Sequence, residues 1–395
     1  MHDPLPNIRH PAVSRVRILR VMRPWIFRCA RWLFFTVGVF LLTGHLGGQG
    51  VNADGWRIAE PGYVFHFPAD HGPHPGFRTE WWYFTGNLAA GDGREFGFEL
   101  TFFRHGYRPP DPARTRQSPF ATGEVKFAHF TITDVNERHF YPYEKISRGA
   151  FGEAGYNRGG TLVWIEDWQV DYNGDFRLRA AAGQCAIDLE LEPEMAPVLQ
   201  GVDGFSRKAD GPGRASYYYS IPRLKTRGTV RLGVNTWAVT GISWFDREWA
   251  TNQLEPQQAG WNWFAIELDD GSSLMLYQMR LKDGGIDPYS SGKYVNREGQ
   301  VTPVARDDFQ LVPNRFWQRD RSAPRYPTGW QLSIPKLALA LTVMTPVEDQ
   351  ELRLSSRYWE GCIRLTGTRA GQPIRGTGYM ELTGYGGAVA GLTSP

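Results

Sequence analysis

The stretch WWYFTGNLAAGDGREFGFEL, residues 81–100, decides the fold, because a second form of it stands later in the chain. The later stretch is WNWFAIELDDGSSLMLYQM, residues 261–279. It aligns with the first stretch without gaps, so that Trp81 pairs with Trp261. Each copy holds a strand of alternating residues, an Asp-Gly turn and a returning apolar strand, which is the pattern of a β-hairpin. The sequence therefore predicts an internal duplication built from β-hairpins.

A second pair of stretches supports the duplication. Residues 217–244 and 357–382 both have aromatic residues at or next to their start and hold two strand-like runs joined by a turn. Other alternating runs with one apolar face are found at 126–135, 161–172, 186–192 and 337–344. We therefore expect an all-β protein with two similar units, residues 55–240 and 241–395.

Length and composition agree with two all-β domains. A chain of 395 residues is too long for one ordinary core and fits two domains of roughly 150 to 200 residues each. The chain has 45 Gly, 27 Pro and 14% aromatic residues, which favours strands and turns over long helices. A barrel of about eight strands can enclose one small apolar ligand, whereas a sandwich fills that space with side chains. Both architectures stay open at this point.

Residues 1–53 differ in character from the rest of the chain. The first fifty residues hold seven Arg and one Asp, and their apolar run of about a dozen residues is shorter than a membrane-spanning helix needs. The small residues of VNA, at 51–53, suit a signal peptidase. We expect an export signal, with an uncleaved membrane anchor as the alternative. Both place the remainder in the periplasm or on the outer face of the inner membrane.

The charge and motif content of the remaining chain excludes several classes of protein. The leader has a formal charge of +6 and the whole chain has +3, so the remainder has about −3. It offers no run of basic residues that could bind nucleic acid. HExxH, CxxC, GxGxxG and GxSxG are absent, so we expect no metal site, dinucleotide site or hydrolase elbow. The cluster of His66, His71 and His74 fits a surface loop better than a metal site.

Six ordered motifs resemble a known family: RTEWWYFTGNL, SWFDREW, GWNWFAIELDDG, DPYSSG, YWEG and GYMELTGY. They are similar to the AttH-type family of tandem lipocalin-like proteins, which includes carotenoid 1,2-hydratase, also called hydroxyneurosporene synthase. The likeness runs from about residue 60 to the C-terminus. It implies two lipocalin-like (calycin-type) β-barrel or barrel-sandwich domains, an apolar ligand site near their junction and no organic cofactor. Carotenoid hydratases of this family add water across a terminal isoprenoid double bond.

The segment FDREW, residues 245–249, offers residue types that such a hydration needs. Protonating an alkene requires an acid, and the resulting carbocation is stabilised by aromatic faces. On an extended strand Asp246 and Glu248 share one face, while Arg247 points to the other. The hydratase branch that the chain resembles has His where this chain has Arg247, and Arg cannot shuttle protons near neutral pH. Hydration would therefore use Asp246 or Glu248.

The candidate residues fall into two groups. The candidate catalytic residues are acids, namely Asp246, Glu248 and Glu80. The candidate ligand-binding residues are mainly aromatic, namely Trp81, Tyr83, Tyr218, Arg247, Trp249, Trp261, Trp263 and Tyr289. A structural interpretation is available for most of them: Glu80 and the Asp246 to Glu248 segment can form ion pairs, with Arg78 or Arg247 as a partner of Glu80. Tyr358, Trp359 and Glu360 are expected to contribute mainly to packing.

Three functional hypotheses follow. The first is an enzyme similar to carotenoid 1,2-hydratase, a hydro-lyase that adds water to an isoprenoid-type double bond by carboxylate acid catalysis. The second is a non-catalytic periplasmic protein that binds a lipid or another hydrophobe and associates with a membrane transporter. The third is a structural or interaction protein of the envelope. The first two share a small hydrophobic ligand and need no cofactor.

Overall fold

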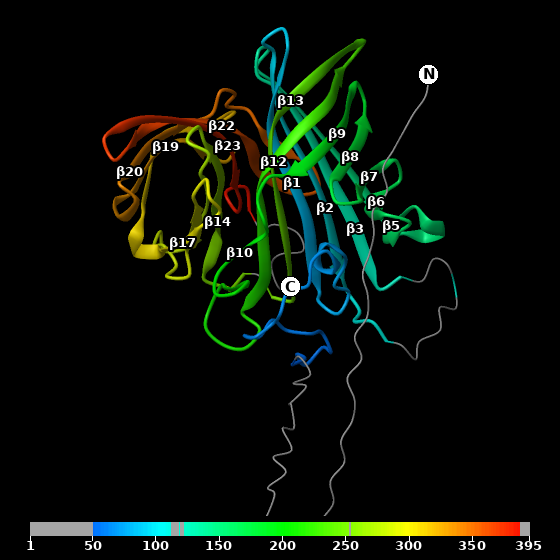
Figure 1. The fold of residues 1–395 in the computed structure, drawn as a ribbon. Coiled ribbons are helices and arrows are strands. Elements are labelled where there is room, and N and C mark those ends of the chain that lie inside the picture. Colours follow the sequence, from blue (N-terminus) through cyan, green and yellow to red (C-terminus); the bar gives the residue numbers. More distant parts are fainter. Residues whose placement is uncertain (1–49, 112–117, 119–121, 253, 388–395) are drawn as a thin grey trace, which may run out of the picture. The chain divides into compact units, whose positions relative to one another are not determined.

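The computed structural model describes residues 50–111, 118, 122–252 and 254–387, and these form two β-sheets (Figure 1). The strands of the first sheet are β1 (Thr79–Ala90), β2 (Glu95–Gly106), β3 (Glu124–Asp134), β4 (His139–Ser147), β5 (Ala154–Arg158), β6 (Thr161–Ile165), β7 (Trp168–Tyr172), β8 (Phe176–Ala182), β9 (Cys185–Pro193), β10 (Val198–Leu199), β11 (Phe205–Arg207), β12 (Ala215–Leu232) and β13 (Asn235–Ala250). Those of the second are β14 (Gln258–Leu268), β15 (Ser273–Leu281), β16 (Ser291–Val295), β17 (Val301–Ala305), β18 (Gln310–Trp317), β19 (Tyr326–Ile334), β20 (Leu339–Met344), β21 (Glu351–Arg353), β22 (Arg357–Arg369) and β23 (Gln372–Leu382). The helices of this part of the chain are single 3₁₀ turns: η1 (Ala69–His71), η2 (Ala150–Gly152), η3 (Arg306–Asp308) and η4 (Pro335–Leu337).

The first sheet is a nearly closed barrel and the second is a half-barrel, so the prediction of an all-β, barrel-like protein is confirmed. The strand order of the first sheet is β4-β3-β2-β1-β13-β12-β9-β8-β7-β6-β5. The second follows the order β17-β16-β15-β14-β23-β22-β20-β19-β18. Every pair of neighbouring strands in these sheets is antiparallel, as hairpin connections require.

The duplication seen in the sequence is present in the topology. The hairpin β1-β2 continues through β13, β12 and β9, and the hairpin β14-β15 continues through β23, β22 and β20 in the same arrangement. The second pair of similar stretches also occupies equivalent places, since it forms β12-β13 in one sheet and β22-β23 in the other.

The change from the first sheet to the second comes later than the sequence predicts. β13 stays paired with β1 up to the partners Thr79 and Ala250, and the second sheet starts with β14 at Gln258. The expected division between 240 and 241 therefore falls inside β13. The repeat pattern marks where similar residues recur, whereas the hydrogen-bond ladder decides where a sheet ends.

Two predictions about the N-terminal segment lie largely outside the described residues. Of the predicted leader, 1–53, the structure describes only 50–53. Within the part of the chain that is described, no helix has the length and apolar character needed to cross a membrane.

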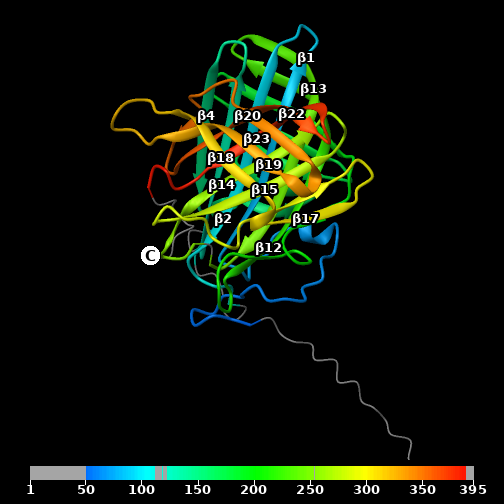
Figure 2. The same cartoon turned by 90° about the vertical axis from the view of Figure 1, so that its left-hand side faces the viewer.

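Because side chains alternate between the two faces of each strand, the apolar residues form one cluster inside each sheet and a third cluster between the sheets. Inward-facing side chains such as Trp82 and Phe84 pack inside the first sheet, and Phe264 packs inside the second. A third cluster holds Tyr83 and Trp263, which point out of their own sheets toward each other. The two sheets are in contact there, β2 with β22 and β1 with β23, and Figure 2 shows the second sheet in front of the first. Both faces of these strands are therefore buried.

Candidate functional site

A pocket lies between the two sheets, and we call it the inter-sheet pocket. Its volume is about 80 Å³, enough for several water molecules or part of a larger ligand. The first unit contributes Trp81, Tyr83, Phe103, Lys208, Tyr218, Asp246 and Glu248, and the second contributes Trp261, Trp263, Tyr277, Met279, Tyr358, Glu360 and Glu381. The lining thus combines aromatic rings with four carboxyl groups and one ammonium group.

The period of two along β13 brings its acids into this pocket. Asp246 and Glu248 face the second sheet, whereas Arg247 points into the first sheet, as the extended-strand argument predicts. Five predicted aromatic residues lie in the same pocket, namely Trp81, Tyr83, Tyr218, Trp261 and Trp263. The structure therefore brings together residues that are up to 182 positions apart, from Trp81 to Trp263.

Asp246 is a buried acid surrounded by neutral donors. Its Oδ1 accepts hydrogen bonds from Ser220 Oγ at 2.5 Å and Trp244 Nε1 at 2.6 Å, and its Oδ2 accepts one from the Tyr218 hydroxyl. Burial raises the pKa of Asp246 to about 7, although these hydrogen bonds oppose the rise. Near neutral pH the carboxyl group is therefore present in both its protonated and its ionised form.

Glu248 and Lys208 form the ionic part of the pocket. Lys208 Nζ lies 3.2 Å from Glu248 Oε1 and donates a hydrogen bond to Ser206 Oγ at 3.0 Å. Burial alone would lower the pKa of Lys208, but the carboxylate of Glu248 raises it, so the amine stays protonated. Among the described residues that line the pocket, Lys208 alone carries a cationic side chain. Its ammonium group also lies 4.5 Å from the ring centre of Tyr277.

The opposite wall carries two acids that the sequence analysis did not select. Burial raises the pKa of Glu381 to about 7, and burial together with the nearby Glu99 carboxyl group raises the pKa of Glu360 well above its usual range. Glu360 Oε1 accepts a hydrogen bond of 2.5 Å from the Tyr83 hydroxyl, across the junction of the sheets. Glu360 Oε2 has no hydrogen-bond partner among the described residues. The expectation that Tyr358 and Glu360 mainly pack is thus wrong, because both line the pocket.

A signal for these acids is present in the sequence. Glu360 and Glu381 are single acids within otherwise apolar stretches, YWEGC and YMELT. A charge in such a position is costly unless it is paired or functional. The pattern alone does not tell which of the two faces of the strand it occupies.

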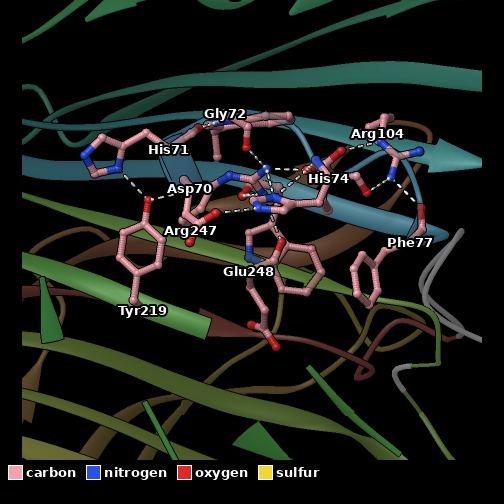
Figure 3. A network of polar contacts seen from close by, with 12 residues as sticks. Asp70, His71, Gly72, His74, Phe77, Arg104, Tyr219, Arg247 and Glu248 are labelled. Atoms are coloured by element: carbon pink, nitrogen blue, oxygen red, sulfur yellow. Dashed lines mark hydrogen bonds and ion pairs between the residues drawn. The ribbon is translucent and has the colours of Figure 1, made fainter. Parts of the chain in front are cut away.

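Glu80, Arg247 and Trp249 do not line the pocket. Trp249 belongs to the core of the first sheet, and Figure 3 shows Arg247 in a network of polar contacts with Gly72 and His74. Glu80 is fully buried and is paired with the guanidinium groups of Arg104 and Arg247. Burial alone would raise the pKa of Glu80, but these two cations hold it well below its usual range. Glu80 is therefore held as a carboxylate in the suggested ion pair with Arg247, and it does not line the pocket.

The register of β1 with β13 explains this placement. Glu80 is the partner of Trp249 and Trp82 is the partner of Arg247, so all four side chains share the inward face. The guanidinium carbon of Arg247 lies 3.9 Å from the ring centre of Trp82. Arg247 and Trp249, predicted as ligand-binding residues, therefore pack inside the first sheet and do not line the pocket.

Two residues of the histidine cluster, His71 and His74, belong to the same interior, whereas His66 is exposed, as expected for a surface loop. His74 stacks on Trp249 with ring centres 3.6 Å apart, and its Nδ1 lies 3.3 Å from Arg247 Nη2. His71 is buried, its Nδ1 is 2.6 Å from the Tyr219 hydroxyl, and burial lowers its pKa to about 4. The expectation of a surface loop is thus wrong for His71 and His74, because this segment is folded into the sheet interior.

Tyr289 stands behind the pocket wall. Its hydroxyl donates to Asp210 Oδ1 at 2.5 Å, and its carbonyl oxygen accepts a 2.6 Å hydrogen bond from the hydroxyl of Tyr277, which does line the pocket. Tyr289 itself is therefore not among the residues that line the pocket.

Comparisons with known proteins agree with this architecture. A family model described as AttH-like matches residues 58–385. A comparison with curated proteins found no match. Among solved structures, an AttH protein from Nitrosomonas europaea is 35% identical with a TM-score of 0.74, over 83% of this chain and 99% of that one. Kievitone hydratase from Nectria haematococca is 13% identical with a TM-score of 0.63, over 85% and 98% of the two chains. CghA is 13% identical with a TM-score of 0.50, over 87% and 98%.

Proposed function

The chain belongs to the AttH-like family, and from this premise we propose that it is a hydratase-like enzyme that adds water to an isoprenoid-type double bond, as in carotenoid hydration, in the inter-sheet pocket. The observation that carries the proposal is Asp246, a buried carboxyl group with a pKa of about 7 among aromatic rings. An acid works best as a proton donor when its pKa is near the working pH. The fold shared with kievitone hydratase supports the proposal at the level of the scaffold.

The proposed reaction starts with proton transfer from Asp246 to one carbon of the double bond. The π electrons form the new C–H bond, and the other carbon becomes a tertiary carbocation. Trp261 and Trp263 offer π faces close to this charge, and such faces attract cations. The aromatic lining therefore lowers the cost of the intermediate.

Water then completes the reaction. Its oxygen forms the C–O bond, and a carboxylate accepts the proton that the oxonium group loses, so that alkene plus water gives an alcohol. Glu248 is suited to orient the water and accept this proton, because Lys208 holds the carboxylate next to the cavity. No cofactor is required by this sequence of steps.

A second candidate function is a non-catalytic carrier of a lipid or another hydrophobe outside the cytoplasm, working with a membrane transporter. It is favoured by the aromatic lining, which would hold an apolar ligand whether or not water is added. The Arg-rich apolar leader favours a periplasmic or membrane-anchored location for either function.

The test of catalysis is the replacement of Asp246 by Asn. Purified protein is incubated with an acyclic carotenoid, and mass spectrometry follows the gain of one water. We expect Asp246→Asn to lower product formation at least about 100-fold, because the amide cannot donate a proton as an acid. Glu267→Gln is the matched control, since Glu267 is also buried with its pKa raised to about 7 by burial but does not line the pocket.

Two results would decide against this proposal. Equal product from Asp246→Asn and the unmodified protein would remove Asp246 from the acid role. Quenching of tryptophan fluorescence by the carotenoid, without any gain of water in the unmodified protein, would favour the carrier.

A further inference from the structure

His129 connects the two sheets beside the pocket and has no part in the proposed hydration. It lies in β3 and is 1% exposed, beside the stacked rings of Phe103 and Phe127. Its Nδ1 is 2.6 Å from the Tyr358 hydroxyl of the second sheet, and its Nε2 is 3.2 Å from Glu144 Oε1. An imidazole with a partner on each nitrogen can accept a proton on one side and release one on the other.

The inner end of this chain of contacts reaches a second buried acid. Tyr358 lines the pocket, and its hydroxyl donates to Glu99 Oε1 at 3.3 Å. Glu99 also accepts a 2.9 Å hydrogen bond from Thr101, whereas its Oε2 has no hydrogen-bond partner among the described residues. Burial, with a contribution from the carboxyl group of Glu381, raises the pKa of Glu99 to about 8. Glu99 is therefore a carboxyl group that holds a proton at neutral pH.

The outer end of the chain of contacts reaches solvent. The side chain of Glu144 is 15% exposed and accepts hydrogen bonds from the backbone N–H of Ser355, at 3.3 Å, and from its hydroxyl. Ser355 itself is exposed. Burial alone would raise the pKa of Glu144, but the hydrogen bonds from His129 and Ser355 lower it. Glu144 is therefore an anionic group that faces water on one side and the buried imidazole on the other.

We propose that Glu144, His129 and Tyr358 form a path along which protons pass between solvent and the carboxyl group of Glu99 beside the inter-sheet pocket. For release, protonated Glu99 gives its proton to the Tyr358 oxygen while Tyr358 O–H passes to His129 Nδ1, and His129 Nε2–H passes to the Glu144 carboxylate. Glu144 then gives a proton to water, so one proton leaves Glu99 and one reaches solvent. The reverse sequence takes a proton up.

The purpose of the path rests on the proposed function. If one carboxyl group in the pocket gives a proton to the alkene and another takes one from water, the two groups must exchange protons with their surroundings before the next turnover. Glu360 lines the pocket and is coupled electrostatically to Glu99, so a proton on Glu99 affects the protonation of the pocket wall. The path itself can be tested without any substrate.

The test measures how fast the buried acid exchanges its proton for deuterium. The infrared C=O band of protonated Glu99 is assigned by its loss in Glu99→Gln, and its isotope shift is followed after rapid transfer of the full chain into D₂O. We expect His129→Asn and Tyr358→Phe each to slow this shift at least tenfold. Thr133→Val is the matched control, because Thr133 Oγ1 of the same strand donates a buried 2.6 Å hydrogen bond to Gln350 and is not part of the path.

The results separate the path from the proposed function. Slower exchange in both path variants, with normal exchange in Thr133→Val and native circular dichroism in all three, supports the path even if no alkene is hydrated. Exchange as fast in both folded path variants as in the unmodified protein would overturn it, whether or not hydration is observed. If one path variant does not fold, the other decides the result.

Discussion

At the scale of single residues, Asp246 and Glu80 show how neighbours decide the chemistry of a buried acid. Both are nearly inaccessible to solvent, yet the pKa of Asp246 is raised by burial among neutral donors, and that of Glu80 is lowered by two guanidinium groups. A buried ionised pair is stable only while both partners are present. Only Asp246 can therefore exchange a proton near neutral pH, although both acids lie near the same strand pair.

The raised pKa of Asp246 predicts a pH-dependent stability. The folded chain holds this proton up to about pH 7, whereas an unperturbed Asp loses it near 3.8. The stabilisation is therefore complete below pH 3.8 and is lost as the pH rises through 7, by about 4 kcal/mol in total. Asp246→Asn lacks this titration, so its free energy of unfolding should rise relative to that of the unmodified protein between pH 4 and pH 8.

Urea unfolding at both pH values measures this difference. Asp188→Asn is the control, because Asp188 forms a solvent-exposed pair with Arg177 and such pairs contribute little. A constant difference between Asp246→Asn and the unmodified protein from pH 4 to pH 8 would contradict the prediction.

At the scale of the strands, the alternation of residues predicts which side chains share a face of the strand. It does not predict which part of the molecule that face contacts. In β1 every residue from Thr79 to Leu88 is buried or half-buried, on both faces. Trp82 and Phe84 face the interior of the first sheet, whereas Trp81 and Tyr83 face the second sheet. Two faces lined with aromatic residues look alike in the sequence, so the pattern cannot tell the pocket from the core.

The contact between β2 and β22 predicts that Gly97 cannot be replaced by a larger residue without loss of stability. A Cβ at Gly97 would lie 2.9 Å from Cys362 Cβ and 3.1 Å from its Sγ, so a side chain there would push the sheets apart. We expect Gly97→Val to lower the free energy of unfolding by about 1 to 3 kcal/mol, as overpacking does. Denaturant unfolding measures this loss. Gly91→Val is the control, because nothing lies within 4 Å of a Cβ at Gly91; equal stability of the two variants would contradict the close approach of the sheets.

At the scale of the whole molecule, buried polar contacts join the two sheets. Tyr83 reaches Glu360 at 2.5 Å and Asn87 reaches the carbonyl oxygen of Gly378 at 3.0 Å. Further cross-sheet contacts involve His129 with Tyr358, Thr133 with Gln350, and Arg364 with Asn87 and Glu95. Separating the sheets would exchange these contacts for hydrogen bonds to water, at a net cost of about 0.5 to 1.5 kcal/mol for each hydrogen bond.

This coupling predicts that the two sheets unfold together. Calorimetry of the purified protein should give one transition whose calorimetric and van't Hoff enthalpies agree, although many chains of this length unfold in several steps. Tryptophan fluorescence and far-ultraviolet circular dichroism should change at the same temperature. Two separate transitions would show that each sheet is stable without the other.

The sequence by itself determined the repeated part of this protein: the β class, the duplicated hairpins and the opposite faces of Asp246 and Arg247. These follow from local rules, since turn residues and the period of two act over a few positions. Only the tertiary structure decided that Asp246 meets Glu360 and Glu381 in one pocket. The physical reason is that the pairing of the two sheets, which sets these neighbours, depends on contacts between residues more than one hundred positions apart.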